Sequence, residues 1–472
     1  MIPFRLFAAA LGLTALLGAC AAPPPEAAPA QSLAARELAP GQWQAPLPHG
    51  GQLGGLSTWW QRQGDPLLVD LIDAAQQHSP SISAASARIA QARANLGTAR
   101  AASVPTLDAS ASASRAQQAT FPTTPPANTV QAGLMAGWEI DLFGAQRAGV
   151  DAARQRLAGA EAGWHDARVS VAAEVANLYI QLRACGVQAQ LAQQDADSKA
   201  STLRLLEASQ KAGFAGGAQV ELARASAHES LGQAMTTGAQ CDALLKGLVA
   251  LTALPESTLR GRLATPSAAI PVPVALASVP AEVLSQRPDL YAAEREVTAA
   301  AQDLAGSQAQ RYPRLTLGGS VALMNVATPA VTTDFTTWSI GPLALSVPLL
   351  DGGRRAAQVQ AAQARYNEAA ALYKARVRSA VREVEEALIH LHATAQRDVP
   401  TRAAAQAWRD ALAATQTRQQ HGLASALEVE EARRMALAAD AGELSLRRDR
   451  LLAWVSLYRA VGGGWERPSL RE

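Results

Sequence analysis

Several features are scarce in this sequence of 472 residues, and each scarcity excludes a class of protein. The formal net charge is only +2, so the chain has no basic field of the kind that binds nucleic acid. The seven histidines are scattered, and no cluster of His, Cys and Asp has the spacing of metal ligands. No glycine-rich loop carries a lysine for phosphate binding. We therefore expect no catalysis, no metal or other cofactor and no nucleic-acid partner.

A long apolar run is also missing beyond the first twenty residues. Because a membrane-spanning helix needs about 20 mainly apolar residues, any insertion into lipid must use amphipathic strands instead. The hydrophobic content of 49% still allows substantial buried cores, and the composition fits an exported, mainly helical chain.

The first twenty residues have the pattern of a bacterial lipoprotein signal. Arg5 is positive, Leu6 to Leu17 form a short apolar stretch, and small residues precede Cys20. We expect residues 1–19 to be removed and Cys20 to carry acyl chains such as palmitate, because several chains anchor a protein firmly. Ala21 stands where an aspartate would signal inner-membrane retention, which favours the outer membrane. A cleaved signal without lipid is the alternative.

The chain carries one long pattern twice, with an offset of 208 positions early in the copies and 209 later. Matched residues include Pro80, Ala85 and Leu96 with Pro288, Ala293 and Leu304, and then Glu174, Gly213 and Arg224 with Glu383, Gly422 and Arg433. Each copy predicts a helix, a strand pair, a long helix, a tight turn and a returning helix. A solenoid unit has only about 20 to 50 residues, so this repeat indicates a duplicated half-protein.

Alternation of apolar residues with polar or small ones predicts four strands. They cover 104–114 and 130–141 in the first copy, and 313–325 and 336–348 in the second. Each is long enough to cross a bilayer as a tilted strand, which takes about 9 to 11 residues. Soluble hairpins with one wet face are the alternative.

Four strands in lipid would impose an oligomer on this chain. Lipid tolerates no open sheet edge, and closed membrane barrels need about eight strands or more. Two copies would supply eight strands and three copies twelve, so several chains must share one barrel if the strands lie in lipid.

The sequence also predicts two very long helices, each followed by a turn and an antiparallel return. The first runs from about Gly149 to Lys211 and the second covers 354–399, with turns near 213–217 and 420–426. In the second helix, apolar residues spaced alternately by four and three positions form a coiled-coil seam. They are Val377, Val381, Val384, Leu388, Leu391 and Ala395. A solid bundle with a mechanical role is the alternative.

Two cysteines remain besides Cys20. Cys185 and Cys241 have their midpoint at residue 213, the glycine of the first turn, so antiparallel helices folded there place them at the same height. In an oxidising compartment they can form a disulfide. The second repeat has Thr394 and Arg450 at the corresponding positions, so the bridge would not be shared between repeats. Two buried, unpaired thiols are the alternative.

A series of short motifs follows one another along the duplicated chain. They are Arg287-Pro288-Asp289-Leu290, Ala292-Ala293-Glu294-Arg295, Tyr312-Pro313, Asp351-Gly352-Gly353-Arg354 and Leu457-Tyr458-Arg459-Ala460 with Gly462-Gly463-Gly464-Trp465. Together and in this order they resemble the TolC-like outer-membrane factor family, in particular its acylated, OprM-like efflux lipoprotein branch. The resemblance covers nearly the whole mature chain.

The resemblance implies a fold that is mainly α with a membrane β part. Four transmembrane strands per chain would build a twelve-stranded barrel in a homotrimer, and the long antiparallel coiled-coil helices would build a twelve-helix periplasmic tunnel. The chain then divides into a signal peptide at 1–19, a tether and equatorial segment at 20–79, a first repeat at 80–255, a linker at 256–287, a second repeat at 288–462 and a tail at 463–472.

The implied function is that of the outer-membrane channel subunit of a tripartite efflux pump, conducting small molecules outward. The implied partners are a periplasmic adaptor, an inner-membrane pump of RND type and outer-membrane lipid. A non-conducting periplasmic coiled-coil lipoprotein, acting as adaptor or scaffold, is the alternative.

The second turn is the candidate periplasmic gate. Leu427, Glu428 and Glu431 match the family's constriction, and Arg434 matches a basic position of OprM-like members. Three copies of each acid around a threefold axis would form a cation-attracting ring. The first turn has Gln219 where some members have aspartate, so one turn per subunit is expected to supply the acids. An ordinary solvated helix face with charged pairs is the alternative.

Overall fold

The computed structural model describes residues 39–46, 59–62, 64–117, 126–264 and 280–467. They form two compact units, which we call the strand unit and the helical unit. The strand unit contains residues 88–160 and 292–373, and the helical unit contains residues 35–87, 161–291 and the chain from 374 onward. None of the helices in the described part of the chain combines the length and hydrophobicity that crossing a membrane requires.

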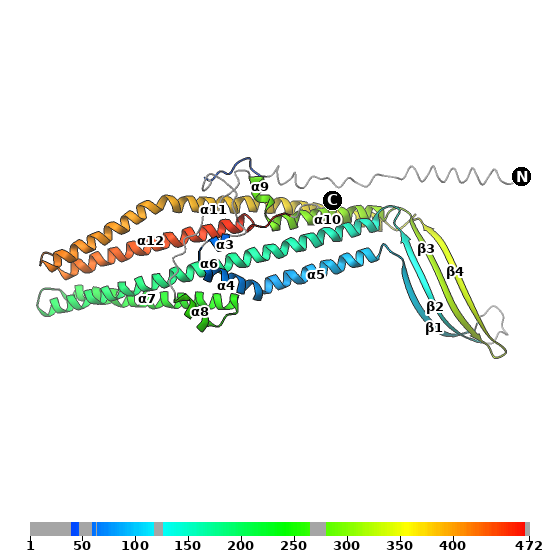
Figure 1. Cartoon of the computed structure of the whole chain (residues 1–472), viewed down its shortest axis with the longest axis horizontal. Helices are drawn as coiled ribbons and strands as arrows, with labels where there is room; N and C mark the ends of the chain where they lie inside the picture. The colour runs from blue at the N-terminus through cyan, green and yellow to red at the C-terminus, as the bar shows by residue number, and fades with distance from the viewer. Residues whose placement is uncertain (1–38, 47–58, 63, 118–125, 265–279, 468–472) are drawn as a thin grey trace. The chain divides into compact units, whose positions relative to one another are not determined.

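The strand unit holds one antiparallel four-stranded sheet in the order β1-β2-β3-β4 (Figure 1). The strands are β1 (Thr106–Ala116), β2 (Ala127–Ile140), β3 (Arg314–Ala327) and β4 (Thr332–Ser346). All four predicted strands are therefore present, but their hairpin ends extend beyond the predicted spans. The reason is that pairing continues through polar residues such as Asp334, opposite Asn325, where the apolar alternation has already stopped.

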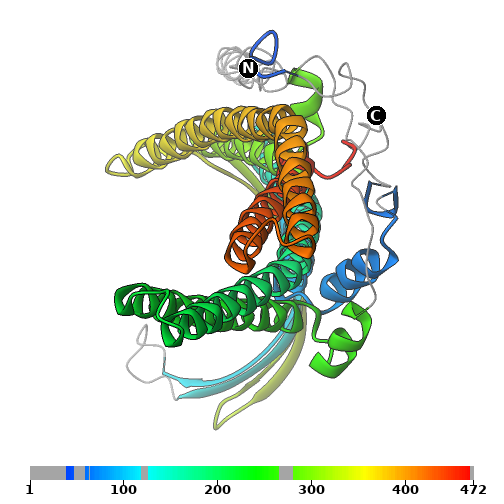
Figure 2. The same cartoon turned by 90° about the vertical axis from the view of Figure 1, so that its left-hand side faces the viewer.

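The pairing register places apolar residues from neighbouring strands on one face of the sheet. Leu134 of β2 lies opposite Val321 of β3, which in turn lies opposite Trp338 of β4. The other face carries small polar residues, among them Ser320 and Ser339, whose hydroxyl oxygens lie 2.9 Å apart. The sheet is curved (Figure 2). It is therefore an amphipathic, curved wall.

A bulge in β4 explains a change of phase in its sequence pattern. Leu317 of β3 pairs with Leu343, whereas Gly319, two residues later, pairs with Ile340, so β4 has one extra residue at this point. The extra residue lies next to Gly341, which has a φ of 110° that a residue with a side chain rarely adopts. In β4, the even-numbered Trp338 and Ile340 before the bulge and the odd-numbered Leu343 and Leu345 after it therefore lie on the same face.

Two long antiparallel hairpins dominate the helical unit, and both turns lie at the same end of it (Figure 1). The first hairpin is α6 (Ala145–Lys211) with α7 (Gly217–Thr252), and the second is α11 (Arg354–Gln420) with α12 (Ala426–Ala460). The shorter helices of the chain are α3 (Trp59–Arg62), α4 (Pro66–His78), α5 (Pro80–Ala101), α8 (Glu256–Leu263), α9 (Pro280–Ser285) and α10 (Pro288–Ala309). The first turns of α6 and α11 belong to the strand unit.

The core of the helical unit lies where the two hairpins meet the short helices. Leu71 of α4, Val175 of α6, Leu248 of α7, Leu388 of α11 and Leu457 of α12 are completely buried there. Burying one such side chain contributes roughly 1.5 to 3 kcal/mol, so this cluster holds the hairpins together more strongly than helix propensity does.

The predicted seam of α11 is confirmed over most of its length and wrong at its end. Val377, Val384 and Leu388 are fully buried, but Ala395 is exposed and Thr394 is buried instead. The Thr394 hydroxyl can be buried because it donates a hydrogen bond of 2.8 Å to the carbonyl of His390. Further along, α11 continues through Pro400, which removes one backbone N–H from the helical ladder.

Candidate functional site

The strand unit presents the surfaces that a barrel wall requires. Its apolar face is uncovered, with Leu107 69% and Ile340 86% exposed. A large exposed apolar surface marks a contact with lipid or with a partner, and the hydroxyl-bearing opposite face suits water. Because β1 and β4 are edge strands, their outer backbone groups have no strand partner among the described residues. The sheet can lie in lipid only when other strands complete it.

Backbone geometry and a capped helix start build the second turn of the helical unit. Gly422 has a φ of 71°, and the backbone N–H of Leu423 donates to the carbonyl of Arg418 at 2.8 Å, which closes the end of α11. Ser425 then caps α12, with its hydroxyl accepting from the N–H of Glu428 at 3.2 Å. These interactions fix where α12 begins and therefore which of its residues face the neighbouring helices.

Glu428, one of the predicted gate acids, is engaged in capping its own helix. Its carboxylate accepts a hydrogen bond of 2.6 Å from the backbone N–H of Ser425, which completes a capping box. That backbone hydrogen bond lowers the pKa of Glu428. The structure therefore gives this residue a local structural role, and its part in a gate stays a prediction.

Glu430 lies between the predicted gate acids Glu428 and Glu431, and unlike Glu431 it is buried. Its carboxylate accepts a hydrogen bond from the hydroxyl of Ser198 on α6 and forms an ion pair of 3.1 Å with Arg433. Val429 beside it is buried as well. This contact joins the start of α12 to the first hairpin. The spacing of buried Val429 and Ala436 along α12 is the signal that could have located this face.

The other predicted gate residues lie at the border of this contact. The side chain of Glu431 is 66% exposed, and its carboxylate lies 3.8 Å from the guanidinium of Arg434. Arg434 also donates to the hydroxyl of Thr202 on α6 at 3.1 Å. Leu427 is partly exposed. Within one chain, Leu427 and Glu431 thus remain available to water or to other copies, whereas Arg434 holds α12 against α6.

The first turn has the same backbone form with different side chains. Gly213 has a φ of 84°, and the N–H of Phe214 donates to the carbonyl of Ser209 at 2.9 Å. Phe214 is 88% exposed, and Leu423, its counterpart in the second turn, is 68% exposed. Gln219, the residue in place of an acid, accepts from the N–H of Gly216 at 3.4 Å. Both turns therefore present an uncovered apolar side chain, which sequence reasoning did not single out.

A disulfide joins the two helices of the first hairpin. It links Cys185 on α6 to Cys241 on α7, with their Cα atoms 5.5 Å apart. The prediction that these two cysteines lie at the same level along the antiparallel helices thus agrees with the structure. In the second hairpin, the corresponding Arg450 forms a long ion pair of 3.8 Å with Asp398. Only the first hairpin has a covalent brace.

The motif that starts at Arg287 serves to join helices. The guanidinium of Arg287 is buried, binds both carboxylate oxygens of Asp289 at 3.0 and 2.8 Å, and donates to Glu383 at 2.8 Å and to the carbonyl of Ala460 at 2.9 Å. Burial by itself would lower the pKa of Arg287, but the two carboxylates outweigh it and raise that pKa. This network ties α10 to α11 and to the end of α12.

The glycines after α12 permit a close approach of two chain segments. A Cβ at Gly462 would lie 2.1 Å from the carbonyl oxygen of Gln286, and one at Gly463 would lie 2.5 Å from the side chain of Val169. Both glycines also have positive φ values. The motif therefore packs the chain against α6 and against the segment just before α10.

One predicted site residue lies outside the described residues. Cys20, the predicted lipid attachment site, precedes residue 39, where the described part begins. In the described ranges no group of three or more His, Cys, Asp or Glu residues is arranged to hold a metal ion.

Comparisons with known proteins agree over nearly the whole chain. The model of the outer membrane efflux protein family matches residues 71–253 and 279–463. The chain is 29% identical over 460 residues to the pyoverdine export outer membrane protein OpmQ of Pseudomonas aeruginosa, which covers 96% of this chain and 95% of OpmQ. It is 28% identical over 477 residues to the outer membrane protein OprJ of the same species, covering 97% of this chain and 96% of OprJ.

A solved structure shows the same arrangement of elements. The outer membrane protein VceC of Vibrio cholerae matches with a TM-score of 0.72 and 28% identity, covering 87% of this chain and 99% of VceC. The similarity therefore extends over both repeats, with their strands and their helical hairpins.

Proposed function

Because the chain belongs to the outer membrane efflux protein family, we propose that it is the outer-membrane channel subunit of a tripartite efflux pump. It conducts small molecules from a periplasmic adaptor and an inner-membrane pump of RND type to the exterior. The proposal assigns no catalysis to the chain, since passage through an open duct breaks no bond. The family match over both repeats favours this channel over a non-conducting adaptor or scaffold.

The amphipathic sheet with two open edges carries the proposal. Its apolar face suits lipid, its polar face suits a water-filled lumen, and its edges require further strands. Three chains would supply twelve strands, and a barrel of that size leaves a lumen that side chains do not fill. Such a lumen discriminates little between solutes, so selection among substrates belongs to the pump.

The start of α12 supports a closure at the periplasmic end of the duct. Leu427 and Glu431 are exposed within one chain, and three copies of each around an axis would narrow the lumen and attract cations. The contacts of Glu430 and Arg434 with α6 hold this segment in place. Opening then requires α12 to move relative to α6.

Exposed apolar residues at both turns support a partner at the same end. Phe214 and Leu423 are uncovered there, one at each turn, and together they offer a partner apolar contacts at this end. We assign this surface to the adaptor, and we assign acylation of Cys20 to the anchoring of the chain in the outer membrane.

Conductance across a planar bilayer tests the function. Purified full-length protein is expected to produce discrete current steps, and addition of protein-free detergent is expected to produce none. A protein that inserts into the bilayer but never conducts, including after replacement of Leu427 and Glu431 by alanine to widen the closure, would contradict the proposal.

A further inference from the structure

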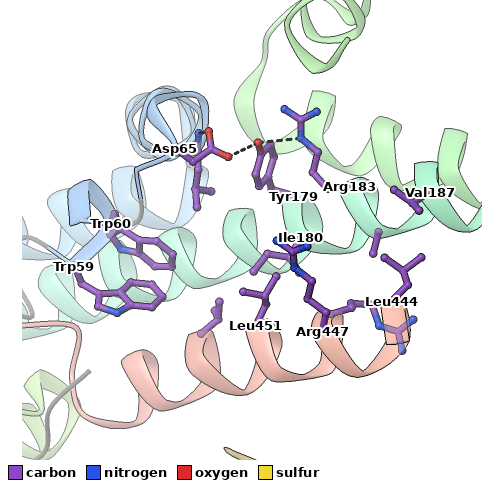
Figure 3. A pocket seen from close by; sticks show the side chains of 14 residues that line it. Trp59, Trp60, Asp65, Tyr179, Ile180, Arg183, Val187, Leu444, Arg447 and Leu451 are labelled. Carbon is purple, nitrogen blue, oxygen red and sulfur yellow. Dashed lines mark hydrogen bonds between the residues drawn. The ribbon is translucent and has the colours of Figure 1, made fainter. Parts of the chain in front are cut away.

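A partly open cavity of about 170 Å³ lies inside the helical unit (Figure 3). Its walls come from α6 and α12, one helix of each hairpin, and from α3 and α4. The larger apolar side chains that line it are those of Trp59, Trp60, Leu68, Ile180, Val187, Leu444, Leu451 and Val455. Two indole rings and a set of branched aliphatic side chains give it the character of a small-molecule site.

The only acid among the lining residues has its charge engaged in structure. Asp65 caps α4, accepting from the backbone N–H groups of Leu67 at 3.1 Å and Leu68 at 3.3 Å. Its other oxygen accepts a hydrogen bond of 2.6 Å from the Tyr179 hydroxyl. Burial, and then the hydrogen bond to Asp65, raise the pKa of Tyr179, so the hydroxyl remains a donor. This end of the cavity is therefore satisfied without a ligand.

Three arginines also line the cavity, and they differ in how far they are engaged. Arg183 donates to the Tyr179 hydroxyl at 3.0 Å and to the carbonyl of Leu263 at 2.7 Å. Arg448 forms an ion pair of 2.7 Å with Asp449. Arg447 makes no hydrogen bond or ion pair with any residue in the described part of the chain, and it extends from α12 across the opening toward α6 (Figure 3). The cavity thus has an apolar interior and more positive than negative charges in its lining. The guanidinium of Arg447 is the one that remains available to a ligand.

We propose that this cavity binds a small aromatic carboxylate, with its ring against the apolar lining and its carboxylate on Arg447. The size fits, because a cavity of about 150 Å³ accommodates a benzene ring. The charge fits as well, because a guanidinium binds a carboxylate through two parallel hydrogen bonds. A neutral or cationic ring of the same size would leave Arg447 without a counter-charge and would bind more weakly.

Because the cavity lies between α6 and α12, a bound ligand would affect how these two helices move relative to each other. Ala184 in its lining is followed by Cys185, which the disulfide braces to α7, whereas Arg447 and Leu451 belong to the hairpin that carries Glu431. A ligand here contacts both hairpins of one chain. It binds the arrangement in which α6 and α12 lie side by side, so it stabilises that arrangement against movement of α12.

Calorimetric titration of the purified full-length protein with benzoate tests the site, and it needs no pump or adaptor. We expect saturable binding of benzoate, and at least about tenfold weaker binding of benzyl alcohol and benzylammonium, which lack the carboxylate. R447Q is expected to weaken benzoate binding by about tenfold or more. V187F, which narrows the cavity from a partly exposed position, is expected to abolish it.

R378Q is the matched control, because Arg378 is an exposed arginine of α11 that does not line the cavity. It should bind benzoate as the unaltered protein does. The proposal is overturned if benzoate does not bind, if the three ring compounds bind equally, or if R447Q and V187F leave benzoate binding unchanged while both variants retain their helical circular dichroism. Loss of conductance in the bilayer experiment would leave these results unaffected, so the two proposals fail separately.

Discussion

Three glutamates at the start of α12 show how neighbouring residues of one type take different roles. Glu428 caps the helix, Glu430 is buried against Ser198, and Glu431 is exposed with only a distant contact to Arg434. A helix turns by about 100° per residue, so adjacent positions face different surroundings. Of the three, Glu431 has the most exposed carboxylate, and it is therefore the acid that we propose for the gate.

Replacement of Glu431 by alanine should lower the preference of the channel for cations severalfold or increase leakage through its resting state. Three negative charges near the axis would be lost, and rings of acids attract cations into pores. Single-channel recording of conductance and reversal potential measures both effects. E229A is the control, since Glu229 is an exposed acid of α7 away from the second turn. Unchanged conductance, selectivity and leakage in E431A would contradict the assignment of Glu431 to the gate.

Replacement of Asp166 by asparagine should stabilise the protein at neutral pH by a few degrees in unfolding temperature. Burial raises the pKa of Asp166, and the charge of Asp289 raises it further against the charges of Arg287, Arg459 and Arg376. The folded state therefore holds the proton more tightly than the unfolded state, and ionisation of Asp166 destabilises the fold at about 1.4 kcal/mol per pKa unit. The stability that D166N gains over the unaltered protein should be largest above the pKa of Asp166 in the folded state. It should vanish below the pKa of Asp166 in the unfolded state, which is about 3.9.

Thermal unfolding of D166N measured between acid and neutral pH checks this predicted stabilisation.

Replacement of Asp289 by asparagine should instead destabilise the protein at neutral pH. Burial would raise the pKa of Asp289, but its hydrogen bonds to Arg287 prevail and lower that pKa. Its ionised form therefore stabilises the fold above the unfolded pKa, and this contribution is lost as the pH falls through the folded pKa. Removing one partner of such a pair costs roughly 3 to 5 kcal/mol. A D166N protein that is less stable at neutral pH would refute the assignment.

At the scale of elements, the two hairpins share a backbone plan but differ in how they are braced. The first has the Cys185–Cys241 disulfide, and its long helix has no proline. The second has Pro400 inside α11, and its two helices are joined by ion pairs such as Arg409 with Asp440 and Glu443. Exposed ion pairs contribute little, about 0 to 1 kcal/mol each. The second hairpin is therefore the more easily deformed one, and it is also the one that carries the residues we propose for the gate.

Replacement of both cysteines by serine should destabilise the first hairpin by about 4 kcal/mol in the chain-entropy estimate, because the bridge closes a separation of 56 residues. Hydrogen exchange should lose protection in α6 and α7 near the bridge, with little change in α11 and α12 near Thr394. A reducing agent should reproduce the effect in the unaltered protein and have no further effect in the serine variant. Equal protection in both proteins would mean that the bridge contributes nothing to the hairpin.

At the scale of the whole molecule, the open edges of the sheet decide the assembly. β1 and β4 each present a row of backbone groups that only another strand can pair in lipid. Native mass spectrometry of the purified protein should therefore show three chains, each lacking residues 1–19 and carrying acyl chains on Cys20. A single chain in detergent would contradict the shared barrel, and an unmodified N-terminus would contradict the anchor alone.

The elements of the fold were predictable because they depend on local patterns. The helices α6 and α11, the four strands and both turns follow from periodicity, glycine and the internal repeat. The strand ends were misplaced because ladder pairing extends into polar residues, and Ala395 was misplaced because a threonine hydroxyl found a backbone acceptor within its own helix. The roles of Glu428 and Glu430 also escaped prediction, because both acids lie in one run of charges.

The sequence by itself determined the duplicated plan, the amphipathic strands, the long hairpins and the height at which the two cysteines meet, because each depends on spacing along one chain. Only the tertiary structure decided that Glu430 is buried against α6, that Arg287 joins three helices, and that Arg447 lines a cavity and pairs with no residue in the described part of the chain. These features arise from residues far apart in sequence, and their burial and pairing depend on how helices pack, which no local pattern encodes.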